Sequence, residues 1–255
     1  MITTSFDDKS PAKLNPDMTK DAPKVDACII TFSKRIEQYV VDTYGPECIG
    51  YSYSACGKTP VYKFDHNGKT FALFLSYIGA PACTAMVEDT HVVFKTDKYI
   101  LFGGAGCLDK EIARGKVIVP TAAYRDEGTS YHYAPASDYI DMPGHKLVTE
   151  FMEDAGLPYA LGKTWTTDAI FRETENNFQA RKADGCLSVE MESAGVQAMC
   201  TFRGLNLYCF FTSGDLLDAP KWTMRQKKNQ IKGTQHDPGH FEIALALAEY
   251  VADHA

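Results

Sequence analysis

The alternation of short apolar runs with helical patterns constrains the fold of this 255-residue chain more than any other feature. Strands are expected at 25–32, 61–64, 69–77, 99–102, 116–120 and 207–212, and helices at 35–44, 82–94, 145–155, 189–202 and 241–254. The Asn67-Gly68 pair predicts a hairpin between the second and third of these strands. Because strands that alternate with helices form sheets covered on both faces, this order predicts a three-layer α/β/α fold around a central mixed β-sheet.

Composition limits the partners of the chain. Hydrophobic residues make up 45% of the sequence and charged residues 23%, which is typical of a globular protein with a full core. The net charge of −7 argues against nucleic acid or an anionic membrane surface as a partner. A small anion stays compatible with this charge, because backbone amides or a few arginines can bind phosphate in an acidic protein. No apolar run approaches the roughly 18 residues of a membrane span, so no membrane partner is expected.

The cysteines and the N-terminal segment suggest a reducing compartment. Most of the eight cysteines lie in apolar contexts and no Cys-x-x-Cys pair occurs, so we expect buried thiols and no metal site. The segment 236–240 contains two histidines, but Pro238 and Gly239 exclude a helical ligand geometry there. Residues 1–24 are polar, with three prolines and no secretory apolar region. We therefore expect a flexible arm at 1–24, a single domain at 25–255 and a cytoplasmic location.

Two acidic segments carry the chemistry that the sequence predicts. Glu190-Met191-Glu192 lies where a helix is expected to begin, and Asp215 follows the apolar run 207–211 and a Ser-Gly turn. Ligands of open α/β sheets bind outside the carboxyl ends of the strands. A carboxylate there can accept hydrogen bonds from both hydroxyls of a ribose, and a carboxylic acid of raised pKa can protonate a departing purine. Two acidic groups at one edge of the sheet suit a nucleoside.

Each of these residues also has a purely structural interpretation. Glu190 and Glu192 can favour the positive end of a helix dipole, Met191 can fill a gap in the core, and Asp215 can cap a turn. Spacing alone does not decide between the two interpretations.

Two glycine-bearing turns are further candidates for a ligand site. They lie at 78–81 and 103–106, each after an expected strand. Glycines allow backbone amides to approach a ligand closely, although any sharp strand exit can show this pattern. Neither segment matches a P-loop or a dinucleotide-binding fingerprint, and no nucleophile elbow is present.

Taken together, these segments resemble the nucleoside phosphorylase/uridine phosphorylase family, which includes related nucleosidases. The resemblance extends from about residue 25 to the C-terminus, and its most specific part is 189–194, which is similar to the ribose-binding motif. It implies that Glu190, Met191 and Glu192 hold the ribose. Asp215, at a spacing similar to that in purine-cleaving members, would then protonate the base.

The same resemblance implies a base site. Segment 165–174 is similar to the part of the family that supplies base contacts, and segment 125–135 also matches the family pattern. Phe171 would stack on the base, with Arg172 or Glu173 as a polar contact. Ala105 and Gly106 would line the base from the second glycine turn.

The implied phosphate site consists of Arg35, Gly79 and Gly104, and here the chain departs from the family. The Gly-Asp-Pro turn of the first strand is absent, although Arg35 keeps the place of the family's arginine. Leu101 stands where a phosphate-binding arginine is usual, and no apolar side chain can replace a guanidinium. Arg125 would compensate only if its loop folds inward.

These observations lead to an expected activity with stated alternatives. The expected enzyme cleaves a nucleoside, a purine nucleoside before uridine, with phosphate as co-substrate and without a cofactor. The family implies a homo-oligomer, either a dimer or a trimer of dimers. Hydrolysis by a nucleosidase, uridine phosphorolysis and nucleoside binding without turnover are the alternatives, and the leucine at position 101 favours hydrolysis.

Overall fold

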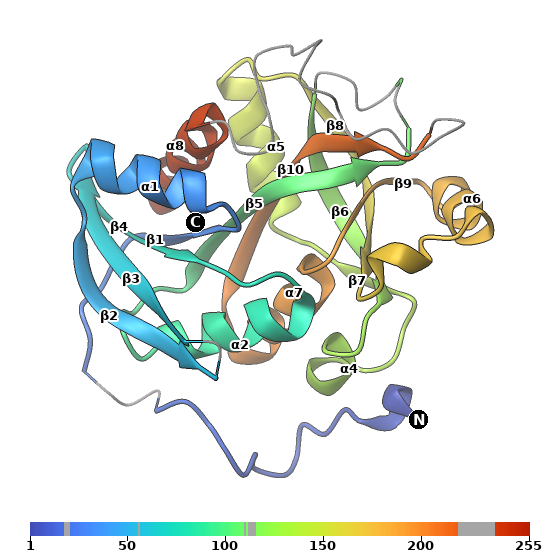
Figure 1. Ribbon diagram of the computed structural model, residues 1–255, viewed down its shortest axis with the longest axis horizontal. Helices are drawn as coiled ribbons and strands as arrows, with labels where there is room; N and C mark the ends of the chain where they lie inside the picture. Colours follow the sequence, from blue (N-terminus) through green and yellow to red (C-terminus); the bar gives the residue numbers. More distant parts are fainter. Residues whose placement is uncertain (18–20, 56, 110, 112–115, 219–237) are drawn as a thin grey trace.

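A mixed β-sheet runs through the middle of the molecule, with helices packed on both of its faces (Figure 1). The computed structural model describes residues 1–17, 21–55, 57–109, 111, 116–218 and 238–255. The strands are β1 (Ala27–Thr31), β2 (Glu47–Ser54), β3 (Gly57–His66), β4 (Lys69–Leu75), β5 (Lys98–Cys107), β6 (Val117–Asp126), β7 (Tyr139–Asp141), β8 (Tyr159–Thr167), β9 (Cys186–Glu190) and β10 (Asn206–Leu216).

The order of the strands is β10-β6-β8-β9-β5-β1-β4-β3-β2, and β7 pairs with β6. Because β5 also pairs with β10, the first five strands of this order close into a ring. Strands β1, β4, β3 and β2 extend the sheet from β5 as an open wing. The ring and the wing therefore share β5, which carries the second glycine segment.

The helices divide the core into two layers. They are α1 (Lys34–Tyr44), α2 (Ala80–Thr90), α4 (Ser130–Tyr133), α5 (His145–Asp154), α6 (Glu175–Ala183), α7 (Ser193–Arg203) and α8 (Pro238–His254), with short 3-10 helices η1 (Ile2–Thr4) and η2 (Ile170–Arg172). One buried cluster joins the sheet to α2 and α7, and a second joins it to α1, α5 and α8. Neighbouring residues of β1 alternate between them, since Ile30 belongs to the first and Ile29 to the second. The predicted three-layer architecture is confirmed.

Local signals place several elements correctly. The hairpin forms between β3 and β4, and Asn67 and Gly68 both have positive φ, at 49° and 77°. Helix α1 begins after Ser33, whose hydroxyl accepts a hydrogen bond from the backbone amide of Ile36. Residues of the types that favour hairpin turns and helix N-caps therefore stand where the chain needs them.

Other expectations were wrong. Residues 103–106 do not form a turn but continue β5 as far as Cys107. Val189 and Glu190 end strand β9, and the helix that was expected from residue 189 begins only at Ser193. Strand β10 likewise continues through the expected Ser-Gly turn to Leu216, with an irregular register after Ser213. Strands β2, β7, β8 and β9 were not predicted.

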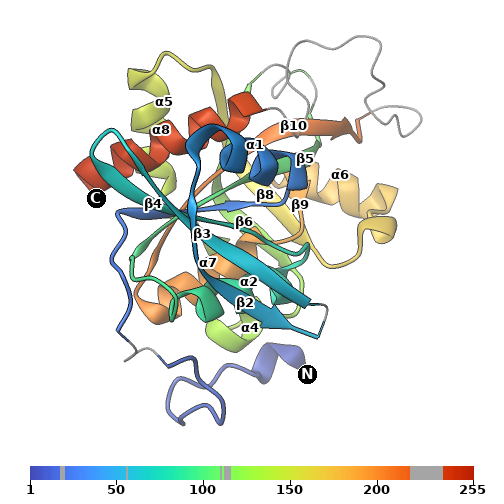
Figure 2. The same cartoon turned by 60° about the vertical axis from the view of Figure 1, so that its left-hand side comes forward.

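The described part of the N-terminal arm lies outside the α/β body (Figures 1 and 2). It runs below α2, and η1 contacts α4 of the same chain. Lys24 and Val25 bring the arm to the sheet through backbone pairing with Lys95. Flexibility of the arm and a contact with a partner subunit stay predictions.

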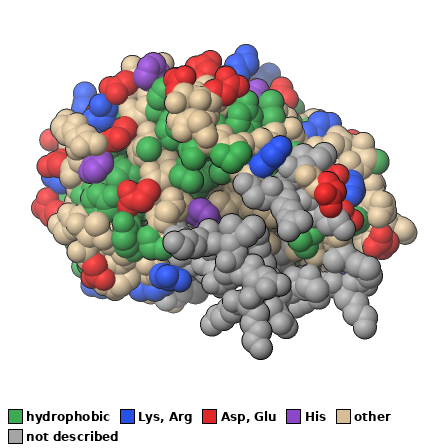
Figure 3. Space-filling model, turned by 90° about the horizontal axis from the view of Figure 1, so that it is seen from above, with side chains coloured by type: hydrophobic (Ala, Val, Ile, Leu, Met, Phe, Trp, Pro, Cys, Tyr) green, Lys and Arg blue, Asp and Glu red, His purple; other side chains and the backbone are tan. Residues whose placement is uncertain are grey.

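The surface shows charges of both signs. On the face in Figure 3, lysine, arginine, aspartate and glutamate side chains are interspersed with apolar groups. Among the residues that the structure describes, no helix is long and apolar enough to cross a membrane.

Candidate active site

Strands β5, β9 and β10 bring three of the predicted segments to one place. Gly106 of β5 lies opposite Val189 of β9, so Ala105 is adjacent in register to Glu190. On its other side β5 pairs in parallel with β10, where Ala105 lies beside Ser213. The glycine segment, the acidic motif and the backbone of the Ser-Gly-Asp segment therefore meet at the carboxyl ends of their strands.

Glu192 is the carboxylate that connects these segments to the first glycine segment. Its side chain is 7% exposed, and one carboxylate oxygen accepts a hydrogen bond from the backbone N–H of Gly79 at 2.7 Å. The other accepts a longer bond of 3.3 Å from the N–H of Met191, a partly buried residue. These two backbone amides leave further acceptor positions on the carboxylate, which has about four.

The surroundings of Glu192 raise its pKa to about 7. Burial contributes most, and the charge of Glu190 adds to it, while the bonds from Gly79 and Met191 act in the opposite direction. The charge of Asp168, at the end of β8, raises the pKa slightly further. A carboxylate with this pKa changes its ionisation near neutral pH, and hydroxyl donors from a ligand would favour its charged form.

Glu190 has a different environment although it lies only two residues away. Its carboxylate accepts hydrogen bonds from the hydroxyls of Thr166 and Ser193 and from the backbone amides of Glu192 and Ser193. Burial nevertheless raises its pKa. These donors occupy the carboxylate and fix the first turn of α7. The observed contacts of Glu190 are therefore those of a residue that stabilises the start of a helix. Ribose binding by Glu190 stays a prediction.

Two residues with important roles here were not singled out from the sequence. Thr166 is fully buried in β8, beside Glu190 in the pairing of β8 with β9, and its hydroxyl also accepts a bond of 3.1 Å from the amide of Ala194. Gly195 lies where a Cβ would come within 2.9 Å of the Cβ of Ala80, so only glycine lets α7 pack this closely on α2. This close packing keeps Gly79 within reach of Glu192. The alternation of Thr164 and Thr166 is the sequence signal that could have indicated this strand.

The glycine positions serve different purposes. Gly79 has φ of +105° and precedes α2, and its N–H is engaged by Glu192 rather than left open for phosphate. Gly104 is exposed within β5, and Ala105 is buried. At Gly106 a Cβ would lie 2.5 Å from Leu217 and 2.8 Å from Val189, so packing alone requires a glycine there.

The predicted base contacts leave from the carboxyl end of β8. Phe171 and Arg172 form part of η2, and Phe171 is 94% exposed. Arg172 is also exposed, and no ion pair of its side chain occurs among the described residues. A fully exposed phenyl ring is free to pack against a ligand or another protein surface, and its role in base stacking stays a prediction.

The residues considered for the phosphate site differ in whether they offer a free positive charge to an anion. Arg35 is exposed on the first turn of α1 and has no ion pair within the described part of the chain. Leu101 is fully buried in the core layer next to α2 and α7. The guanidinium of Arg125 donates to Ser130, at 2.8 Å, and to Pro135, at 2.6 Å, as well as to Ala134 and Ser137. Arg125 therefore organises its own loop and does not replace the missing arginine.

Two parts of the sequence-based site lie outside the described residues. The backbone of Asp215 belongs to β10, but its side chain is not among those described. Residues 236 and 237 of the histidine segment are also outside. Within the described ranges, no group of three or more histidine, cysteine, aspartate or glutamate side chains is arranged to hold a metal ion.

Comparison with known proteins supports the resemblance that the motifs indicated. A purine nucleoside phosphorylase DeoD-type from Alkaliphilus metalliredigens is 24% identical over 207 residues, which cover 80% of this chain and 84% of that protein. A uridine phosphorylase from Klebsiella aerogenes is 27% identical over 161 residues, or 56% of this chain and 63% of that protein.

The fold is also similar to that of a solved structure. The crystal structure of AMP nucleosidase from Bacteroides thetaiotaomicron VPI-5482 matches with a TM-score of 0.68 at 15% identity, over 90% of each chain. A family model described as the phosphorylase superfamily matches residues 32–236. Because this match spans most of the sequence, the chain belongs to the phosphorylase superfamily.

Proposed function

We propose that this protein cleaves the N-glycosidic bond of a purine nucleoside with phosphate, giving the free base and ribose 1-phosphate. The observation that carries the proposal is the buried carboxylate of Glu192. It accepts hydrogen bonds from the backbone amides of Gly79 and Met191 and keeps acceptor capacity that no other described residue uses. Both purine nucleoside and uridine phosphorylases are among the relatives, and the spacing of Asp215 from the acidic motif, similar to that in purine-cleaving members, favours a purine.

In this mechanism Glu192 acts in its ionised form. The carboxylate accepts hydrogen bonds from the two ribose hydroxyls, and Met191 packs against the sugar. As the C1′–N bond breaks, its electron pair moves into the base, and Asp215 donates a proton to the base. Phosphate attacks C1′, and its negative charge stabilises the positive charge that develops on the sugar.

Phosphate would be held mainly by Arg35 and by the backbone at Gly104. Arg35 is an exposed cation after β1, which pairs with β5, and Gly104 is exposed on β5. Gly79 takes part indirectly, because its N–H holds the ribose carboxylate in place. The base would stack on Phe171, beside Arg172 and close to Ala105 and Gly106.

Hydrolysis is the second candidate, and a specific observation favours it. Leu101 is fully buried in the core, and the guanidinium of Arg125 donates hydrogen bonds to residues of its own loop. Neither residue can therefore supply the second cation that a tightly bound phosphate needs. Water would then take the place of phosphate and free ribose would be formed.

We also propose that the protein works as a cytoplasmic homo-oligomer. The support is the exposure of large apolar side chains next to the site, where Ile78 is 67% exposed and Phe171 is 94% exposed. Large exposed apolar side chains, aromatic ones above all, are common in protein–protein interfaces.

The direct test is base release from inosine, adenosine, guanosine and uridine, each with and without phosphate, with identification of the sugar product. The proposal requires release that depends on phosphate and yields ribose 1-phosphate, fastest with a purine nucleoside. Free ribose without phosphate would establish hydrolysis, and the fastest release from uridine would overturn the choice of base. Binding without any release would leave a nucleoside-binding protein.

A further inference from the structure

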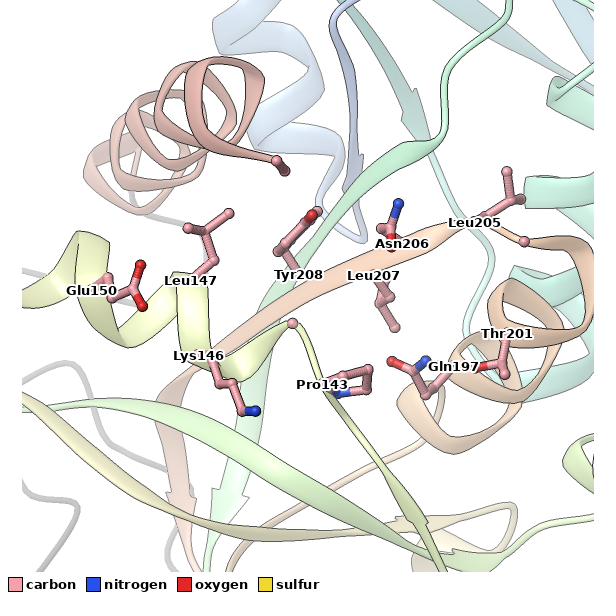
Figure 4. A pocket seen from close by; sticks show the side chains of 13 residues that line it. Pro143, Lys146, Leu147, Glu150, Gln197, Thr201, Leu205, Asn206, Leu207 and Tyr208 are labelled. Atoms are coloured by element: carbon pink, nitrogen blue, oxygen red, sulfur yellow. Dashed lines mark hydrogen bonds between the residues drawn. The ribbon is translucent and has the colours of Figure 1, made fainter.

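A cavity lies beside the middle and the C-terminal end of α7, whereas Glu192 precedes the N-terminal end of this helix (Figure 4). It has a volume of about 590 Å³ and opens between the first turn of α5, the last turns of α7 and the beginning of β10. Gln197, the first residue of α7 that lines it, is about 6 Å along the helix from Ser193, at 1.5 Å per residue, and none of the candidate active-site residues lines the cavity. The size is within the range of about 300–1,000 Å³ that is usual for small-molecule sites.

One side chain in this cavity has an unmet hydrogen-bonding requirement. Gln197 is 2% exposed, and its amide nitrogen donates to the hydroxyl of Thr201 at 3.0 Å. Its amide oxygen is buried and accepts no hydrogen bond from any described residue. Figure 4 shows this oxygen on the side of Gln197 that faces Pro143 and the cavity. A buried acceptor without a donor is unfavourable, and a small rotation of the Gln197 side chain would present its oxygen to an N–H or O–H group of a ligand in the cavity.

The walls of the cavity are tightly packed and largely apolar. At Gly144, which precedes α5, a Cβ would lie 2.1 Å from the carbonyl oxygen of Leu207, so only glycine lets α5 approach β10 this closely. Leu147, Leu207 and the ring of Tyr208 line the space beside it. The hydroxyl of Tyr208 has no hydrogen-bond partner among the described residues, and it offers a second polar contact.

The charges at the cavity favour a neutral ligand. Lys146 and Glu150 are the charged side chains that line it, one of each sign, and both are exposed on α5. Neither belongs to an ion pair within the described ranges. These two charges offset each other, and the carboxylate of Ala255, which also lines the cavity, adds a negative charge. The site therefore disfavours an anion such as phosphate, and a neutral ligand needs no counter-charge.

From these observations we infer that the cavity between α5, α7 and β10 is a second binding site, for a neutral heterocyclic amide such as a free nucleobase. Such a ring has apolar faces, which suit the leucine side chains, and a polar edge whose N–H can donate to the oxygen of Gln197. The inference does not depend on the reaction at Glu192, since the two sites share no residue.

Crystals of the full chain soaked in 5-bromouracil at pH 6 would test this inference, because anomalous scattering by bromine locates each bound molecule. We expect a bromine peak in the cavity, with a ring N–H within hydrogen-bonding distance of the Gln197 oxygen. Bromobenzene has a similar shape without an N–H group and is expected to give no peak there. A cavity empty of 5-bromouracil, or one that binds bromobenzene equally well, would overturn the inference.

Two variants provide the controls. Gln197→Met keeps the size of the side chain and removes the acceptor, so half occupancy should need at least about tenfold more 5-bromouracil, as expected for a lost hydrogen bond. Thr149→Val changes a residue of α5 that does not line the cavity and should keep the wild-type occupancy. If Gln197→Met does not fold, Asn206→Phe at the exposed mouth of the cavity should exclude the probe instead. Unchanged occupancy in Gln197→Met, or in Asn206→Phe where that variant stands in for it, would contradict the proposed site.

Discussion

Glu190 and Glu192 are the same residue type, two positions apart and both buried, yet their surroundings differ. Glu190 is held by two hydroxyls and two backbone amides, all from its own structural neighbourhood. Glu192 is held by two backbone amides, one of them in a loop more than a hundred residues earlier in the chain. The first carboxylate therefore builds the turn, and the second is left with capacity for a ligand. Donors around a carboxylate indicate its role better than its position in a motif.

The largest effect is expected when the charge of Glu192 is removed. We expect Glu192→Gln to lower kcat/KM for the nucleoside by about 10³-fold, because charge-assisted bonds to two ribose hydroxyls are worth about 1.5–3 kcal/mol each. Steady-state kinetics of the nucleoside cleavage measures this change. A variant with wild-type kcat/KM would contradict the role of Glu192 as the ribose anchor.

Removal of the Glu190 carboxylate should act on stability instead. Glu190→Ala leaves four buried donors without an acceptor, and we expect the free energy of unfolding to fall by about 3–5 kcal/mol. Urea denaturation at pH 7 measures this loss. If Glu190→Ala kept its stability and lost only affinity for nucleoside, Glu190 would belong to the ribose site after all.

The raised pKa of Glu192 should also make the stability of the protein depend on pH. The pKa of Glu192 is raised to about 7 from 4.5, so its contribution to stability is complete below pH 4.5 and is lost as the pH rises through about 7. Over that window the loss is about 3 kcal/mol, at 1.36 kcal/mol per unit. Relative to the wild type, Glu192→Gln should therefore gain about 3 kcal/mol in unfolding free energy between pH 4.5 and pH 8. An equal dependence on pH in both proteins would place the titration elsewhere.

The smallest effect is expected at a supporting residue. Thr166→Val removes one donor to Glu190 and keeps the shape of the side chain, which should cost about 1–2 kcal/mol of stability with little change in KM.

Gly79→Ala is the matched change at the Glu192 carboxylate, because the φ of +105° at this position is strained for alanine and the N–H of Gly79 holds Glu192. We expect it to raise KM several-fold. Thermal unfolding and KM measured on both variants would show whether the two effects separate in this way.

The parts of the fold that depend on local chemistry were predictable from the sequence. The Asn67-Gly68 hairpin and the start of α1 at Ser33 need only a turn or a cap. Strands β8 and β9 were missed because their buried positions include polar residues. Thr164 and Ser188 bond to each other between these neighbouring strands, and Thr166 bonds to Glu190. Polar residues of this kind hide the apolar pattern of a strand.

The site was predictable in its composition and less so in its arrangement. The acidic motif and the glycine segments do meet, but the glycines at 103–106 belong to a strand. Gly106 is required by packing against Val189 and Leu217, which no local pattern shows. The contact between Gly79 and Glu192 depends on the packing of α7 against α2, so only the folded chain reveals it.

The most direct test of the central claim compares binding of a purine nucleoside with binding of its 2′,3′-dideoxy analogue to wild type, Glu192→Gln and Glu190→Gln. We predict that the wild type prefers the ribose form by at least about 100-fold, as two charge-assisted hydrogen bonds imply. Glu192→Gln should lose most of this preference, and Glu190→Gln should keep it. An unchanged preference in Glu192→Gln would show that another group recognises the ribose hydroxyls.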